Sequence, residues 1–127
     1  MKFTLGKEER LKSRKLIEQL YQSGTSVKAF PLRLVFLQTP HKSSFPAQAG
    51  FSVPKRNFKK AVDRNRIKRL MRETYRLNKF LVYNQLKQPY VFMISYIGKE
   101  EESYVQLDQK MKEVLQKFTN KIEKGCK

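Results

Sequence analysis

"AVDRNRIKRLMRETYR", residues 61–76, carries two opposed sets of side chains and so decides how the chain folds. Six of its sixteen residues are Arg or Lys, and two are acidic. At about 100° per residue, the two sets separate onto different faces of a helix. The apolar face carries Ile67, Leu70, Met71, Thr74, Leu77 and Leu81, and the basic face carries Asn65, Lys68, Arg69, Arg72, Arg76 and Lys79. We predict a central helix over about 58–81, with Asn57 as its N-cap and its apolar face on the core.

The basic face has a spacing that is unfavourable unless an anion covers it. Lys68 and Arg72 lie four residues apart, as do Arg72 and Arg76, and like charges at this spacing repel by a few tenths of a kcal/mol. Solvated helix faces normally mix signs at this spacing. Residues 55–80 hold 11 Lys and Arg against two acidic residues, a net charge of +9 within the chain total of +17. The pattern favours a face that contacts phosphates.

The composition sets the class of partner. The chain has 127 residues, which predicts one domain, residues 1–127, with one modest core. A net charge of +17 predicts a polyanionic partner, nucleic acid first and an acidic membrane surface second. We expect no membrane span and no secretory signal, because no apolar run is long enough. The single cysteine, Cys126, cannot form an internal disulfide and fits a reducing cytoplasm.

The remaining elements are predicted outward from the central helix. Residues 11–22 form a short amphipathic helix that Gly24 ends. Strands are predicted over residues 30–38, 48–53 and 90–97, the last one covered on both faces. Ser103 caps a final helix that runs through about residue 122, and residues 123–127 are expected to be a disordered tail. The inward-facing residues of this final helix are Leu107, Met111, Val114, Leu115, Phe118 and Ile122. The pattern predicts an α+β sandwich.

The sequence offers no catalytic or metal-binding constellation of its own. The only histidine, His41, is expected to be a solvated loop residue, and one His with one Cys cannot form a zinc site. The acidic run 100–102 is expected to be a solvated start of the final helix rather than an ion site. Asp63 is expected to form a salt bridge close to the basic face.

A longer motif around the central helix resembles that of a known family. "FSVPKR", residues 51–56, is followed by "AVDRNRIKRLMRE", residues 61–73. This pair resembles the strand, basic turn and Arg-Asn-Arg helix of the bacterial ribonuclease P protein family. The likeness extends to Arg-Leu-Lys at residues 10–12, to the helix before Gly24, to the order of elements and to the total length. It therefore covers most of the chain.

This resemblance implies a fold and a function. The implied fold is a two-layer α/β sandwich with a small mixed four-stranded sheet, order α-β-β-β-α-β-α, and a left-handed βαβ crossover, similar to a domain of a ribosomal small-subunit protein. The implied function is that of the accessory protein of a cytoplasmic endoribonuclease whose RNA subunit is the catalyst. The complex removes the 5′ leader of precursor tRNA, and Mg²⁺ ions held mainly by the RNA activate the attacking water. Neither DNA, a membrane nor a stable homo-oligomer is implied.

The implied site residues fall into two groups. The residues expected to bind the catalytic RNA are Lys55, Arg56, Arg64, Asn65, Arg66, Lys68, Arg69, Arg72 and Arg76. The residues expected to line a cleft for the leader, between the first helix and the sheet, are Ile17, Tyr21, Arg33 and Val35. Relatives often have Phe at the positions of Ile17 and Tyr21, and a tyrosine can also stack on a base. Ser95 and Tyr96 stand where many relatives have Ala-Arg.

Three other classes of protein share part of this pattern. A ribosomal or general structured-RNA-binding protein without an enzymatic role would share the charge and a similar fold, and it is the main alternative. A DNA-recognition helix would need a helix-turn-helix frame, whereas strands are predicted on both sides of this helix. A membrane-surface helix would need interfacial aromatic residues on its apolar face, and that face is required by the core.

Overall fold

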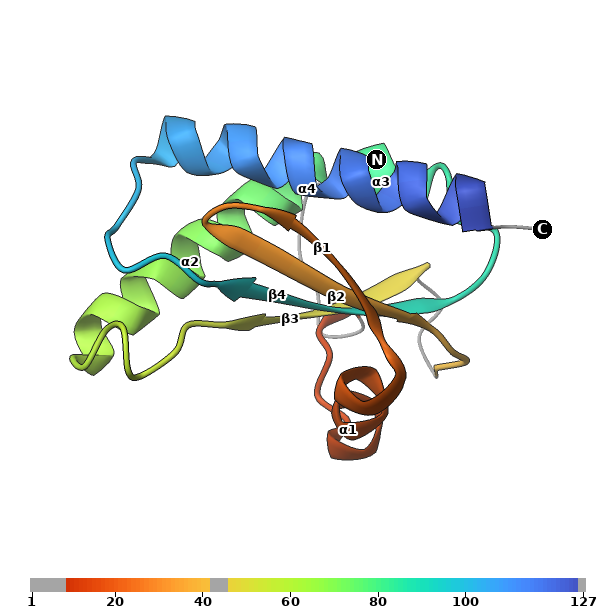
Figure 1. Ribbon diagram of the computed structural model, residues 1–127, viewed down its shortest axis with the longest axis horizontal. Helices are drawn as coiled ribbons and strands as arrows, with labels where there is room; N and C mark the ends of the chain where they lie inside the picture. The colour runs from red at the N-terminus through yellow and green to blue at the C-terminus, as the bar shows by residue number, and fades with distance from the viewer. Residues whose placement is uncertain (1–8, 42–45, 126–127) are drawn as a thin grey trace.

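The order of helices and strands follows the predicted pattern (Figure 1). The computed structural model describes residues 9–41 and 46–125. The elements are α1 (Arg14–Ser23), β1 (Thr25–Ala29), β2 (Leu32–Gln38), β3 (Ala47–Ser52), α2 (Ala61–Asn78), α3 (Phe80–Tyr83), β4 (Tyr90–Tyr96) and α4 (Tyr104–Gly125). None of the helices in these ranges is long and apolar enough to cross a membrane.

The four strands form one mixed sheet in the order β1-β2-β4-β3. β2 is antiparallel to both β1 and β4, whereas β3 runs parallel to β4. Arg10 extends the β3 edge by a single parallel bridge to Ala49, and the Leu11 N–H donates to the Ala49 carbonyl at 3.0 Å. The most apolar strand of the chain, β4, is thus central in the sheet, as its composition predicts.

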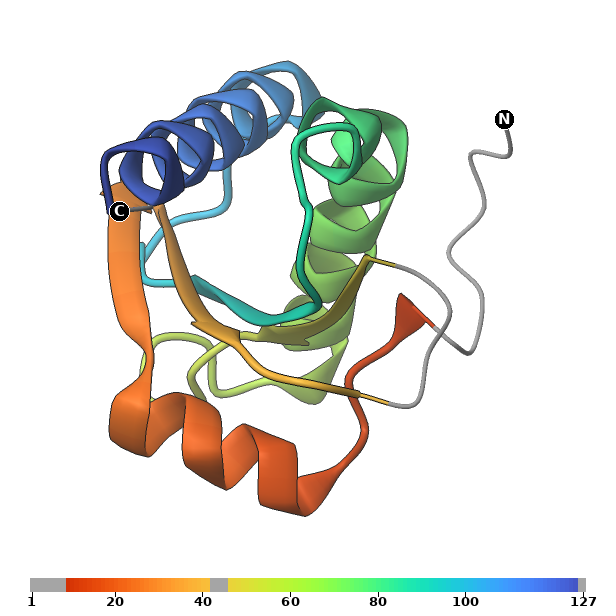
Figure 2. The same cartoon turned by 90° about the vertical axis from the view of Figure 1, so that its right-hand side faces the viewer.

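The helices form two layers around this sheet. α2 and α4 cover one face and α1 lies across the other (Figures 1 and 2). In Figure 2, β3 and β4 run away from the viewer with β4 to the left of β3, and α2 returns toward the viewer on the face of the sheet that α4 also covers. The β3–α2–β4 crossover is therefore left-handed, against the usual preference. The predicted α+β sandwich with a mixed four-stranded sheet is confirmed.

The main core lies between the sheet and the helices α2 and α4. Phe118 of α4 packs edge-on against Phe36 and Phe92, with ring centroids 4.7 and 4.9 Å apart. All six predicted inward residues of α4 are in this core, five of them fully buried and Ile122 partly. The helix starts at a reciprocal cap: the Gln106 N–H donates to Ser103 Oγ at 3.3 Å, and the Ser103 N–H donates to Gln106 Oε1 at 3.4 Å. Ser103 is thus the cap that the sequence predicts.

A second, smaller cluster holds α1 against the other face. It contains Leu11, Leu20, Val35, Val91 and Met93. At the end of α1 the chain approaches the sheet so closely that a Cβ on Gly24 would lie 2.3 Å from the Leu20 carbonyl oxygen. Only glycine fits there without a shift of the backbone, so Gly24 sets the position of α1 over the sheet.

The central helix is shorter at its start than predicted. α2 begins at Ala61 after Lys60, which makes no side-chain cap, and Asn57 is not the N-cap. The Asn57 amide instead donates to the Gly98 carbonyl at 3.5 Å. Phe58 is buried and packs edge-on against Tyr96 at 5.7 Å between centroids. Burial of Phe58 keeps this segment out of the helix, because its ring has to reach the end of β4.

The end of the central helix also differs from the prediction. α2 stops at Asn78, and Leu77 and Leu81, predicted in the core, are 40% and 53% exposed. Lys79, predicted on the basic face, is buried instead, and its Nζ lies 2.6 Å from Glu9 Oε2. The Tyr83 hydroxyl donates to the same carboxylate oxygen at 2.7 Å. The buried carboxylate of Glu9 draws Lys79 inward and turns the chain, so the assignment of Lys79 to the basic face is wrong.

Two smaller differences concern other parts of the chain. The sequence assigns no residues to the strand that became β1, whose five residues alternate poorly between polar and apolar. The predicted tail begins at residue 123, whereas α4 continues to Gly125. Cys126 lies outside the described residues.

Candidate nucleic-acid interface

The outward face of α2 presents cations without acidic neighbours. Arg69, Arg72 and Asn65 are exposed and Lys68 is half-buried. Among the ion pairs of residues 9–41 and 46–125, none involves Lys68, Arg69 or Arg72. The opposite face of the same helix is buried through Ile67, Met71, Thr74, Tyr75 and Asn78. Helical periodicity therefore places these cations on the surface, as the sequence predicts.

Arg66 differs from its neighbours because two carboxylates already hold it. Its Nε donates to Glu101 Oε1 at 2.8 Å and its Nη2 to Glu101 Oε2 at 2.7 Å. The same Nη2 lies 2.6 Å from Asp63 Oδ1, so Asp63 forms the predicted salt bridge. The hydrogen bond from Arg66 lowers the pKa of Glu101, and the bond to Glu101 raises the pKa of Arg66. Local spacing could not indicate Glu101 as a partner, because it lies 35 residues from Arg66.

Two further arginines of the predicted set have contacts within the protein. Arg64 Nη1 donates to the carbonyls of Phe58 and Lys59, at 2.8 Å each, and so fixes the turn before α2. Arg76 forms an ion pair with Glu73, three residues earlier, and this hydrogen bond lowers the pKa of Glu73. Both guanidinium groups are partly exposed and belong to the same basic surface.

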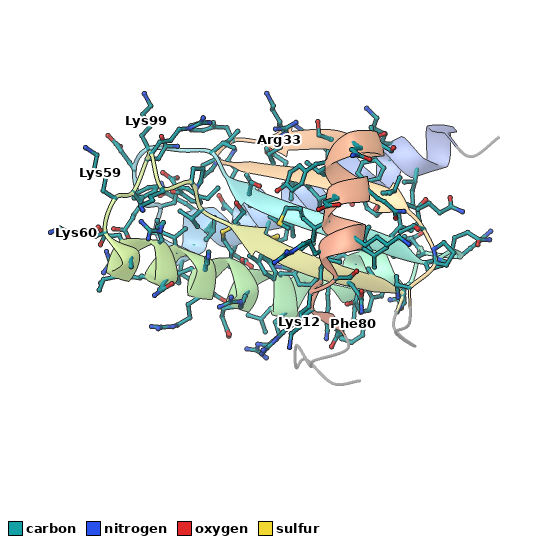
Figure 3. The ribbon with its side chains drawn as sticks, turned by 90° about the horizontal axis from the view of Figure 1, so that it is seen from below. Lys12, Arg33, Lys59, Lys60, Phe80 and Lys99 are labelled. Atoms are coloured by element: carbon teal, nitrogen blue, oxygen red, sulfur yellow. The ribbon has the colours of Figure 1, made fainter. Side chains whose placement is uncertain are left out.

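The turn between β3 and α2 adds more positive charge. Lys55 and Arg56 are exposed directly after β3, and Lys59 and Lys60 are exposed before α2. Figure 3 shows Lys59 and Lys60 at one end of the molecule, with Lys99 near them. The basic surface is therefore continuous along the chain from the turn to the middle of α2.

The sheet face under α1 holds the other predicted group. α1 crosses this face, and Arg33 lies beside it (Figure 3). Tyr21 is 57% exposed and Ile17 is half-buried against the small cluster. Arg33 and Val35 lie on the predicted face, but Val35 is only 6% exposed because α1 packs on it. Val35 thus supports α1 and presents little surface, whereas Tyr21 and Arg33 are exposed.

A basic cavity lies where α1 begins, and the sequence did not predict it. Its volume is about 430 Å³, which is enough for a small group. The lining residues are Arg10, Lys12, Ser13, Leu16, Pro40, His41 and Gln48. His41, predicted to be solvated, is half-buried in this wall.

The described part of the chain contains no group of three or more His, Cys, Asp or Glu side chains that could hold a metal ion. The acidic residues nearest the basic surface, Asp63 and Glu101, are both paired with Arg66. Because both carboxylates are paired with Arg66, Asp63 and Glu101 do not fit a magnesium site.

Comparison with known proteins gives matches in sequence and in structure. A family model described as Ribonuclease P matches residues 5–119. The "Ribonuclease P protein component" of Porphyromonas gingivalis is 40% identical over 91 residues, 71% of this chain and 66% of that protein. The protein of the same name from Pseudoalteromonas translucida is 34% identical over 125 residues, 98% of this chain and 81% of that protein. The chain thus spans just under two thirds of the length of the first of these relatives.

Solved structures share the fold. The RNase P protein of Staphylococcus aureus superposes with a TM-score of 0.67 at 24% identity, covering 87% of this chain and 94% of that one. The RNase P protein from Thermotoga maritima gives a TM-score of 0.68 at 21% identity, covering 86% and 96%. At these identities the superpositions establish the fold alone.

Proposed function

The chain belongs to the ribonuclease P protein family, and we propose that it is the accessory protein subunit of ribonuclease P. In this role it binds the catalytic RNA and the 5′ leader of precursor tRNA, and it assists the endonucleolytic removal of the leader. It acts in the cytoplasm, without a DNA or membrane partner and without a stable homo-oligomer.

The observation that carries this proposal is the exposed basic face of α2. Lys68, Arg69 and Arg72 lie opposite the core and form no ion pair with another described residue. Cations in such a row neutralise RNA phosphates and release counterions, which makes binding strong and dependent on salt. The proposed RNA-binding residues are Lys55, Arg56, Arg64, Asn65, Arg66, Lys68, Arg69, Arg72 and Arg76.

The leader is proposed to bind on the opposite face, beside α1. Tyr21 offers an exposed ring on which a base can stack, and Arg33 offers a cation for the backbone of a single strand. Ile17 and Val35 contribute mainly by packing, which holds α1 at a fixed distance from the sheet. The two proposed surfaces lie on different sides of the sheet, so one protein can contact both RNAs.

The catalytic chemistry is assigned to the RNA. Magnesium bound by the RNA supplies a metal-activated water for phosphodiester hydrolysis. Residues 9–41 and 46–125 include no group of three or more His, Cys, Asp or Glu side chains that could hold a metal ion. The residues of this chain are proposed to bind and position RNA.

Reconstitution tests the proposal. The purified protein is mixed with a bacterial ribonuclease P RNA at low magnesium and moderate salt, and release of the 5′ leader from a precursor tRNA is followed. We expect strong stimulation over the RNA alone. Tight binding to other structured RNAs, with no stimulation of several ribonuclease P RNAs, would support the ribosomal or general RNA-binding alternative instead.

A further inference from the structure

We propose that Glu101 is a positioning residue for RNA binding, which holds the guanidinium of Arg66 so that its Nη1 amino group is left to bind a phosphate. This inference rests on the proposed function, because it concerns how one residue of the basic surface meets RNA. It assigns a binding role to an acidic residue, which simple charge arguments would count as a repulsive neighbour.

The hydrogen-bond pattern of Arg66 carries the inference. Glu101 accepts hydrogen bonds from Nε and Nη2 of Arg66 in a bidentate contact, at 2.8 and 2.7 Å. Asp63 accepts a further hydrogen bond from Nη2. The second amino group of the guanidinium, Nη1, has two N–H donors, and the described residues accept no hydrogen bond from it. The side chain of Arg66 remains 48% exposed. A phosphate can therefore bind Nη1 while Glu101 stays in place.

The segment that carries Glu101 is itself held on both sides. One residue earlier, the Glu100 carbonyl accepts a hydrogen bond from the buried Tyr96 hydroxyl. Two residues later, Ser103 caps α4. Glu101 is thus fixed by the end of β4 and the start of α4, so its carboxylate can orient a side chain of α2. An arginine that is already ordered loses less rotamer freedom when it binds, and this loss otherwise reduces affinity.

The neighbouring residue Glu100 supplies a matched control, because it is exposed and has the same charge as Glu101. Among the described residues Glu100 forms no ion pair. Affinity for a ribonuclease P RNA would be measured by titration for wild type, Glu101→Gln and Glu100→Gln. Removal of a negative charge should strengthen binding to a polyanion, so Glu100→Gln should tighten binding by less than about twofold. Glu101→Gln should instead weaken binding by about two- to fivefold, because Arg66 loses its orientation.

The sign of the change decides between the explanations. If both variants bind the RNA more tightly by the same factor, Glu101 contributes only its charge. If Glu101→Gln binds more tightly than Glu100→Gln, Glu101 competes with the RNA for Arg66. Either result overturns the inference. In an Arg66→Ala background the weakening by Glu101→Gln should disappear, and its persistence would also overturn the inference.

The same titration separates this inference from the proposed function. If the wild-type protein does not bind the RNA, the proposed function is wrong and this inference fails with it. A wild-type protein that binds, together with variants that fail the sign test, overturns the inference alone.

Discussion

Replacing Arg69 and Arg72 together with alanine tests the basic face most directly. Both side chains are exposed, and neither has an ion pair among the residues that the structure describes. Their removal leaves the buried face of α2 unchanged. It also removes the repulsion of Arg72 with Lys68 and with Arg76, so thermal stability should not fall.

The magnitude follows from the number of phosphates contacted. Each contact contributes about 0.7–0.9 to the slope of log K against log salt concentration. If about five of the nine proposed residues each contact one phosphate, wild-type affinity should fall about 130- to 500-fold between about 50 and 200 mM salt. The double variant, with three contacts left, should lose only about 20- to 40-fold over the same interval, and its slope should be shallower by about 1.4–1.8.

The assay is a series of RNA-binding titrations at increasing monovalent salt and constant magnesium. Replacement of Lys110 and Lys112 with alanine is the matched control, because it removes the same charge from the surface of α4, where both lysines pair with acidic residues. The control should leave the slope almost unchanged. An equal loss of slope in the two variants would refute the reasoning, since total charge rather than the face of α2 would then govern binding.

Three other results are expected. Lys79→Met should lower the free energy of unfolding by about 3–5 kcal/mol in urea titrations, since it leaves Glu9 buried without this cation; if combining it with Glu9→Leu recovers none of the loss, the ion pair is not the cause. Burial raises the pKa of Tyr96 to about 12, so the contribution of this residue to the free energy of unfolding should stay constant up to about pH 10 and decline from about pH 10 to 12, as the unfolded phenol ionises first. Denaturation at pH 9 and 11 measures this, and an increase would contradict it. Tyr21→Ala should weaken binding of precursor tRNA by about 1–3 kcal/mol while sparing mature tRNA, and an equal loss for both would show that Tyr21 does not contact the leader.

The features that could be predicted from the sequence depend on local spacing. Helical periodicity within a few turns predicts the buried apolar face of α4 and the outward position of Arg69 and Arg72. The Ser103 cap of α4 is also a local feature. The central position of β4 follows from its continuous apolar composition. These patterns need no knowledge of distant residues.

The features that could not be predicted depend on partners far along the chain. Lys79 leaves the basic face because Glu9 lies 70 residues earlier, and Arg66 is oriented by a carboxylate 35 residues later. The position of β1 cannot be predicted, because its short sequence, TSVKA, pairs with β2 without an alternating pattern of its own. Tertiary pairing, and not local propensity, determines these positions.

The turn of the chain at Lys79 also gives the basic face a fixed length. From Asn65 to Arg76 the helix rises by about 17 Å, roughly half of one turn of a nucleic-acid duplex. A surface of this size can follow one stretch of backbone and then ends. Lys55 and Arg56 lie in the turn before α2, beyond this face. We therefore expect the protein to favour a folded RNA whose backbone follows both the helix and the turn.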